Sequence, residues 1–265
     1  MTRKGRGKRP TLDGVQIKID RAQVHKNSLN EDLFRLFPGR TYVITPEIYD
    51  DGRRHVFRAS NPPDPNPAWS ATVGDCLHNL RSALDHLAYQ LVLRPNTTTQ
   101  FPIKVCPPRE GWRHRRVLPD ISGGVRDPAV RTVLEKVQPY NRRDLNHGLG
   151  LLRELNNIDK HRELIVTVTA TTGHLTSAWT GDPNAPPPSH TTFTHRPLKH
   201  GEVIAVIAYE SPYRQADPNL QFFPDIAFGD GGPVAKENVG IVLDDLMARV
   251  CEDIKEFESF FPTSP

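Results

Sequence analysis

The sequence predicts an α+β protein, with a helical bundle core, an antiparallel β-sheet in the C-terminal half and a β-hairpin near residues 41–58. Three observations support this fold class. In several long segments the apolar residues recur every three or four positions, which is the spacing of one helix face. Other runs are rich in Val, Ile, Thr and Phe and are bounded by Gly, Asp and Pro, as is typical of strands. With 265 residues, 37% of them hydrophobic, the chain can bury a sizeable core.

We predict that residues 1–15 form a disordered basic tail and that residues 16–265 form a single α+β domain. Five Lys and Arg residues, and no acid, lie among the first nine positions. Since the chain has 34 Lys and Arg in all, 29 remain elsewhere against 31 Asp and Glu, so the body is not a broadly basic nucleic-acid surface. The tail could bind phosphate backbones non-specifically or could only solubilise the chain, and both alternatives stay open.

The composition favours a cytoplasmic protein without cofactors. Three cysteines, an odd number without C-x-x-C spacing, favour reduced thiols over disulfides or a structural zinc site. No apolar run approaches the roughly 18 residues that a membrane span needs, and no apolar segment follows the basic N-terminus as in a secretory signal. The chain lacks a P-loop, a GxGxxG fingerprint, a GxSxG elbow and an HExxH helix. We expect no cofactor and no metal, because only two of the predicted helices offer metal-ligand residue types.

In the N-terminal half, local signals define two helices and a hairpin. Apolar spacing predicts a helix over residues 17–37, ended by a Pro-Gly pair. The following segment alternates like a strand and turns at Asp50-Asp51-Gly52. A second, central helix should begin at Ser70 or Thr72, either of which can cap it, and should stop before Pro95.

In the C-terminal half, the same signals predict two more long helices, three strands and a loop insertion. Asp127 and the proline after it suit the first two positions of a short helix. The remaining expected elements are a helix at 144–160, a strand at 163–170, a loop insertion at 171–200, strands at 202–209 and 220–228, and a last helix at 238–261.

The central helix carries unusual polar residues beside its apolar stripe. They comprise two His, one Arg, two Asp and one Asn, where a solvated face would show Lys, Glu and Gln. At about 100° per residue, His78, Arg81 and Asp85 share one flank, while Asn79 and His86 lie nearly opposite the stripe. Arg81 and Asp85 are four residues apart, so they form either a surface ion pair worth a few tenths of a kcal/mol or part of a site.

The helix at 144–160 places two polar residues on its apolar face. Asn156 and Asp159 continue a stripe of Leu residues, and a buried carboxylate needs a partner. Arg81 flanks the stripe of the central helix and is the best-placed cation, with His78 and His161 as secondary candidates. We therefore expect the two helices to pack side by side, with Arg81 and Asp159 at salt-bridge distance.

Two segments resemble a family of uncharacterised bacterial proteins, many of them actinobacterial. The first is His78-Asn79-Leu80-Arg81-Ser82-Ala83-Leu84-Asp85-His86-Leu87, and the second is Asn156-Asn157-Ile158-Asp159-Lys160-His161-Arg162. The likeness extends over most of the chain, including Gln100-Phe101-Pro102-Ile103 and Gln138-Pro139-Tyr140. This resemblance implies no known activity.

The R-x4-H spacing from Arg81 to His86 resembles the R-x4–6-H motif of HEPN ribonucleases, which are helical, dimeric and metal-independent and occur in toxin–antitoxin and phage-defence systems. The chain departs from them at Ser82, where the family often has Asn, Asp or His, and in its β-rich C-terminal half. The resemblance implies RNA as a partner and a homodimer as the assembly. Because Arg81 and His86 lie about 140° apart on an ideal helix, they could meet only across a dimer interface or at a helix break.

In such a ribonuclease, a histidine moves the proton of an attacking ribose 2′-OH and an arginine neutralises the charge that grows on the phosphate. The candidate catalytic residues are Arg81, His86 and His78. The candidate supporting residues are Asn79, Asp85, Asn156, Asp159, Lys160, His161 and Arg162. The alternative function is a non-catalytic structural or ligand-binding protein whose His/Arg/Asp cluster orders the helix packing.

Overall fold

The computed structural model describes residues 9–36, 42–43, 46–62, 64–107, 121–142, 148–162, 164–171, 186–193, 198–214 and 221–262. These residues form helices and antiparallel sheets, which confirms the predicted α+β fold class. The chain divides into two compact units. The helical unit comprises Met1–Lys26, Thr72–Glu163 and Ile241–Pro265, and the β unit comprises Asn27–Ala71 and Leu164–Gly240.

The range 16–265, predicted as one domain, therefore contains two units whose segments alternate along the chain, with boundaries inside the two N-terminal helices. The first helix begins at Asp13, inside the segment that we predicted as a disordered tail of 15 residues. Residues 1–8 of that tail lie outside the described part of the chain.

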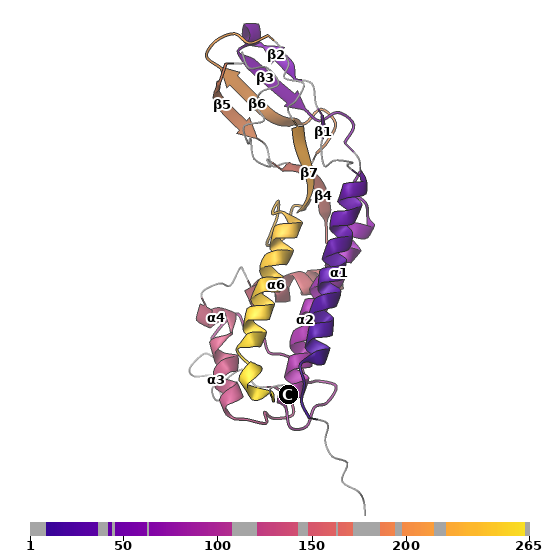
Figure 1. Ribbon diagram of the computed structural model, residues 1–265, viewed down its shortest axis with the longest axis vertical. Helices are drawn as coiled ribbons and strands as arrows, with labels where there is room; N and C mark the ends of the chain where they lie inside the picture. Colours follow the sequence, from indigo (N-terminus) through magenta and orange to yellow (C-terminus); the bar gives the residue numbers. More distant parts are fainter. Residues whose placement is uncertain are drawn as a thin grey trace, which may run out of the picture. The chain divides into compact units, whose positions relative to one another are not determined.

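The helical unit is built around the central helix (Figure 1). It contains α3 (Ala129–Lys136), α4 (Pro139–Arg142) and α5 (Gly148–His161). It also contains the first part of α1 (Asp13–Leu36) and most of α2 (Ala68–Leu91) and α6 (Val239–Lys255), the last followed by a 3-10 turn at Glu258–Phe260. The four leucines in the middle of the α2 stripe are fully buried, as the spacing predicts: Leu77, Leu80, Leu84 and Leu87.

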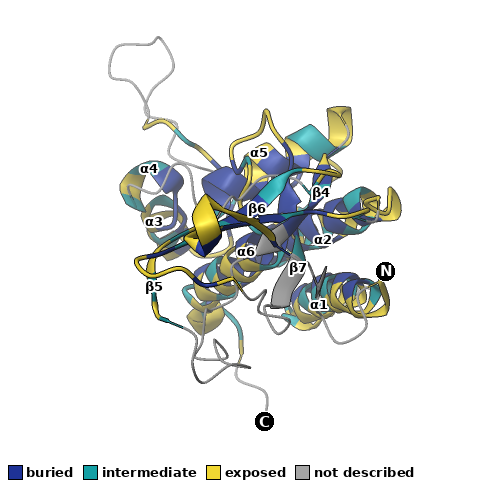
Figure 2. Cartoon of the chain, turned by 90° about the horizontal axis from the view of Figure 1, so that it is seen from above, coloured by how far each residue is buried: buried dark blue, intermediate teal, exposed yellow. Residues whose placement is uncertain are grey.

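Contacts near the middle of α1 hold it to α2 and α6. The buried Cys76 thiol of α2 donates a 3.4 Å hydrogen bond to the Ala22 carbonyl of α1, and burial raises the pKa of this thiol to about 12. Lys26 of α1 forms an ion pair with Asp244 of α6. Figure 2 shows that α1 has both buried and exposed positions along its length, as an amphipathic surface helix should.

The first residues of α3 and α2 can be compared with the N-caps predicted for these two helices. The Asp127 carboxylate accepts a 2.8 Å hydrogen bond from the Ala129 N–H, which confirms the cap of α3. The predicted caps of α2 at Ser70 and Thr72 are wrong, because the Asn66 side chain accepts a 3.0 Å bond from the Ala68 N–H and starts the helix earlier. For α5, the predicted start at residue 144 lies outside the described residues.

The β unit contains two antiparallel sheets. One has the order β1-β7-β4 and the other the order β2-β3-β6-β5. The strands are β1 (Tyr42–Val43), β2 (Glu47–Tyr49), β3 (Arg54–Arg58), β4 (Val166–Thr171), β5 (Pro188–Phe193), β6 (Val203–Tyr209) and β7 (Gln221–Phe228). Phe57, Ile204 and Ile207 lie in the core of this unit, together with Tyr209 and Tyr213.

The predicted hairpin is present in β2 and β3, which join through a 3-10 turn at Asp50–Gly52. β1, at the start of the predicted hairpin region, instead pairs with β7. The prediction of a loop throughout 171–200 is wrong over β5, which pairs with β6. This strand was missed because its pairing partner lies beyond the insertion, while Pro and Ser residues dominate the local pattern.

Candidate functional site

An ion pair on α2 fastens a distant loop segment to the helix. Arg81 Nη2 donates hydrogen bonds to Asp85 Oδ1 at 2.9 Å and to the Phe101 carbonyl at 2.7 Å. The same Asp85 oxygen accepts the Phe101 N–H at 2.8 Å. The pair therefore binds both backbone groups of Phe101, as a neighbouring strand would. With side chains 14% and 30% exposed, the pair is more buried than an ordinary surface ion pair.

Gln138 also binds the backbone of this segment, at Pro102 and Lys104. Its Oε1 accepts the Lys104 N–H at 2.8 Å, and its Nε2 donates to the carbonyls of Pro102 and Leu134 at 3.1 and 2.8 Å. The side chain is fully buried, and these bonds satisfy it. Gln138 was not among the predicted site residues. A glutamine directly before Pro139 at a helix end is a weak local signal, since its partners Pro102 and Lys104 lie more than 30 residues away.

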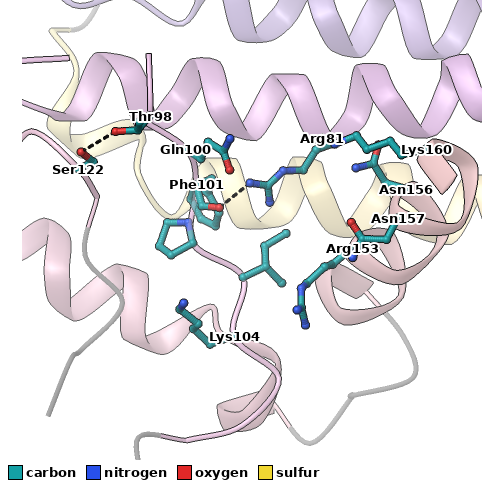
Figure 3. A pocket seen from close by; sticks show the side chains of 12 residues that line it. Arg81, Thr98, Gln100, Phe101, Lys104, Ser122, Arg153, Asn156, Asn157 and Lys160 are labelled. Atoms are coloured by element: carbon teal, nitrogen blue, oxygen red, sulfur yellow. Dashed lines mark hydrogen bonds between the residues drawn. The ribbon is translucent and has the colours of Figure 1, made fainter. Parts of the chain in front are cut away.

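Residues 101–104, held in this way, form one wall of a pocket of about 410 Å³ within the helical unit (Figure 3). α5 and the side chain of Arg81 contribute other parts of the lining. The described lining residues are Arg81, Thr98, Gln100, Phe101, Pro102, Ile103, Lys104, Ser122, Arg153, Asn156, Asn157 and Lys160. Four of these side chains are cationic and none is acidic.

The four cations come from three segments. Arg81 is on α2, and Lys104 is the last residue of the fastened segment 101–104. Arg153 and Lys160 are seven residues apart on α5, two turns along one face. Burial lowers the pKa of the Arg81 guanidinium; Asp85 opposes this effect and the nearby Arg153 adds to it. The two guanidinium groups are thus close enough to repel each other. Among the described residues, Arg81 forms an ion pair with Asp85 and Lys160 interacts electrostatically with the adjacent Asp159, while Lys104 and Arg153 have no acidic partner.

Asn156 lies on the same face of α5, between Arg153 and Lys160. Its side chain is 3% exposed, which confirms the predicted burial, and its Oδ1 atom has no hydrogen-bond partner. An unpaired buried amide group costs about 1–3 kcal/mol. Because the oxygen and nitrogen of an amide can exchange places by a flip, the group can accept from or donate to a ligand in the pocket.

The predicted contact between Arg81 and Asp159 is wrong, although α5 does contact α2 through Asp159 and Gly74. Asp159 lies about two turns before Arg81 along α2, against Gly74, where a Cβ atom would come within 2.6 Å of its Cγ. Burial and the neighbouring Asp75 raise the pKa of the Asp159 carboxyl, while His78 and Lys160 lower it. Arg81 is seven residues from Gly74 and binds Asp85 and the Phe101 carbonyl instead.

The structure separates the other candidate residues. Arg81, Asn156 and Lys160 line the pocket, with Asp85 behind Arg81. His78 is exposed and interacts with Asp159. The exposed His86 is on the side of α2 that meets α1, where a Cβ on Gly14 would come within 2.7 Å of its Nδ1. A single chain therefore does not bring Arg81 and His86 into one site.

The remaining candidates lie outside the pocket. Asn79 donates a 2.8 Å hydrogen bond from its side chain to the Asp75 carbonyl one turn earlier. His161 and Arg162 are exposed at the end of α5. Sequence reasoning missed Arg153, Lys104 and Gln100, although the position of Arg153 three residues before Asn156 was a usable helical signal.

Among the described residues, no group of three or more His, Cys, Asp or Glu side chains is arranged to hold a metal ion. No described helix is long and apolar enough to cross a membrane. Comparison with known proteins adds no constraint, since no family model, curated protein or solved structure matches this chain.

Proposed function

We propose that the helical unit binds a ligand that carries phosphate, in the pocket between Arg81, α5 and residues 98–104. The observation that carries this proposal is the convergence of four cations on a pocket whose described lining contains no acid. An anion would relieve the repulsion between these cations. The planar guanidinium groups of Arg81 and Arg153 suit phosphate oxygens, to which arginine can donate two parallel hydrogen bonds.

This proposed function corresponds to the non-catalytic, ligand-binding alternative that the sequence left open. The described lining contains no His, Cys, Asp or Glu that could act as a general acid or base on a bound ligand. The ion pair at Arg81 is partly structural, since it also holds the Phe101 backbone. A cytoplasmic location, as the cysteines suggest, belongs to the same proposal.

Isothermal titration calorimetry with inorganic phosphate and pyrophosphate tests this function on the full chain. We expect Arg153→Gln and Lys160→Gln each to weaken binding by about tenfold or more, since charge-assisted hydrogen bonds contribute about 1.5–3 kcal/mol. Lys255→Gln, which removes an exposed cation on α6 outside the pocket, is the matched control. Failure of both anions to bind the unmodified protein would refute the proposal.

A second proposal is the HEPN-like ribonuclease or RNA-binding effector, of the toxin–antitoxin or phage-defence type, acting as a homodimer. Its support is the R-x4-H spacing together with the exposure of His78 and His86. Because His86 is on the α1 side of α2, this activity needs a second copy of the chain to supply His86 to the Arg81 pocket.

RNA incubated with the protein in EDTA distinguishes this second proposal. It predicts fragments ending in 2′,3′-cyclic phosphate, and their loss in His86→Ala. It also predicts a dimer in analytical ultracentrifugation. A monomer that binds phosphate and leaves RNA intact would exclude the ribonuclease and leave the ligand-binding function standing.

A further inference from the structure

The pocket at Arg81 has more positive charge than a single phosphodiester can balance. Resting on the proposed ligand-binding function, we infer that the site selects a small molecule with a terminal phosphate monoester over a ligand whose phosphate is a diester. Three features of the described lining support this selectivity: its net charge, its one aromatic residue and the arrangement of α5.

The charge balance favours a dianion. Asp85 neutralises Arg81 through the 2.9 Å ion pair, and Asp159 partly offsets the charge of Lys160, which leaves Lys104 and Arg153 without an acidic partner among the described residues. A phosphate monoester carries about −1.5 to −2 charges at pH 7 and has three terminal oxygens. A diester carries one charge and has two free oxygens, so it would leave more of the cationic repulsion uncompensated.

The apolar part of the lining argues against a polynucleotide track. Proteins that bind single strands stack successive bases on exposed aromatic faces. Phe101 is the one aromatic residue among the described lining residues, and it is 1% exposed. Its ring packs edge-on against Phe257 at a centroid distance of 5.9 Å, so no face is open to a base. The volume of about 410 Å³ lies within the range of small-molecule sites.

α5 presents a row of ligand-directed groups. Arg153, Asn156 and Lys160 follow one another at spacings of three and four residues, so they share one face toward the pocket (Figure 3). Asn156 therefore lies between the two cations, with its buried Oδ1 unpaired. When the phosphate of a ligand binds the cations, a hydroxyl or amine on the rest of that ligand can hydrogen-bond to the Asn156 amide. Such a polar, phosphorylated small molecule satisfies both features.

The test compares two probes that differ only in the ester: adenosine 5′-monophosphate and its phosphate O-methyl ester. Calorimetric titration of the full chain should give at least about tenfold tighter binding for the monoester. Methyl phosphate and dimethyl phosphate repeat the comparison without the nucleoside. In Arg153→Gln the preference should shrink to less than about threefold, while Lys255→Gln should retain it. Arg153 is exposed, so its replacement should leave the fold intact, which circular dichroism verifies.

The outcomes separate this inference from the proposed function. Equal affinity for monoester and diester, with inorganic phosphate still bound, would overturn the selectivity and leave the anion site standing. Tighter binding of the diester would overturn it in the same way. If inorganic phosphate, pyrophosphate and all four esters fail to bind, both the inference and the proposed function are wrong.

Discussion

Two contacts on α2 each involve an aspartate, with opposite electrostatic results. At Arg81, a carboxylate from one turn away and a backbone carbonyl share one guanidinium group, so the charges are paired and the loop is held. Near Gly74, the Asp159 carboxyl packs against the helix beside a second carboxylate, Asp75, and its pKa is raised. The difference shows that a charged residue on an amphipathic helix stabilises packing only where the partner's position completes its hydrogen bonds.

The largest expected effect is at the paired contact. Arg81→Met should lower the free energy of unfolding by about 3 kcal/mol, because it leaves the Asp85 carboxylate and the Phe101 carbonyl without their charged donor. Urea unfolding of Arg81→Met, Asp85→Ala and the double variant should give a coupling energy of about 1–2 kcal/mol. A loss below about 1 kcal/mol in Arg81→Met would show that the pair is an ordinary surface ion pair.

The close approach at Gly74 should give the next largest effect. Gly74→Ala should cost about 1–2 kcal/mol in urea unfolding, since the new Cβ overlaps the Asp159 carboxyl group and α2 or α5 must shift. Introduced into Asp159→Ala, the same change should instead stabilise by up to about 1 kcal/mol, because alanine is favoured over glycine within a helix. Gly232→Ala, with open space around the added Cβ, is the control. Equal costs in both backgrounds would contradict the predicted overlap.

Asp159 itself should produce a smaller effect that depends on pH. Burial and Asp75 raise the pKa of its carboxyl, so the folded state holds the proton more tightly than the unfolded state. Stability is therefore lost as the pH rises from the unfolded value of about 4 through the higher folded value. Asp159→Asn should be the more stable protein at pH 7, by less than about 1 kcal/mol, with an advantage that shrinks toward pH 3. Thermal unfolding at several pH values measures it, and a less stable variant at pH 7 would show that the charge is compensated.

The smallest stability effect is expected at His86, on the opposite side of α2 from the ion pair. Its side chain is exposed, so His86→Ala should change the free energy of unfolding by less than about 0.5 kcal/mol. Urea unfolding beside Arg81→Met makes the comparison direct. A loss above 1 kcal/mol would mean that packing of His86 near Gly14 contributes to the α1–α2 contact.

By itself, the sequence determined the elements whose signals are local. The leucine spacing of α2, the turn between β2 and β3, the Asp127 cap and the buried face of α5 with Asn156 all depend on neighbours within a few residues. Helical and strand periodicity records which side of an element avoids water, and the chain order carries that information directly.

The tertiary structure alone decided which distant groups become the hydrogen-bond and contact partners of the polar residues. The Arg81–Asp85 pair binds the backbone of Phe101, which lies 20 and 16 residues away in the sequence. Gln138 binds the next part of that segment. Asp159 contacts Gly74 and not Arg81. Periodicity predicts the face on which a side chain lies, but it cannot predict the axial offset between two packed helices. Here an offset of about two turns of α2, roughly 11 Å, places Asp159 at Gly74 and out of reach of Arg81, because hydrogen bonds and ion pairs act only at short range.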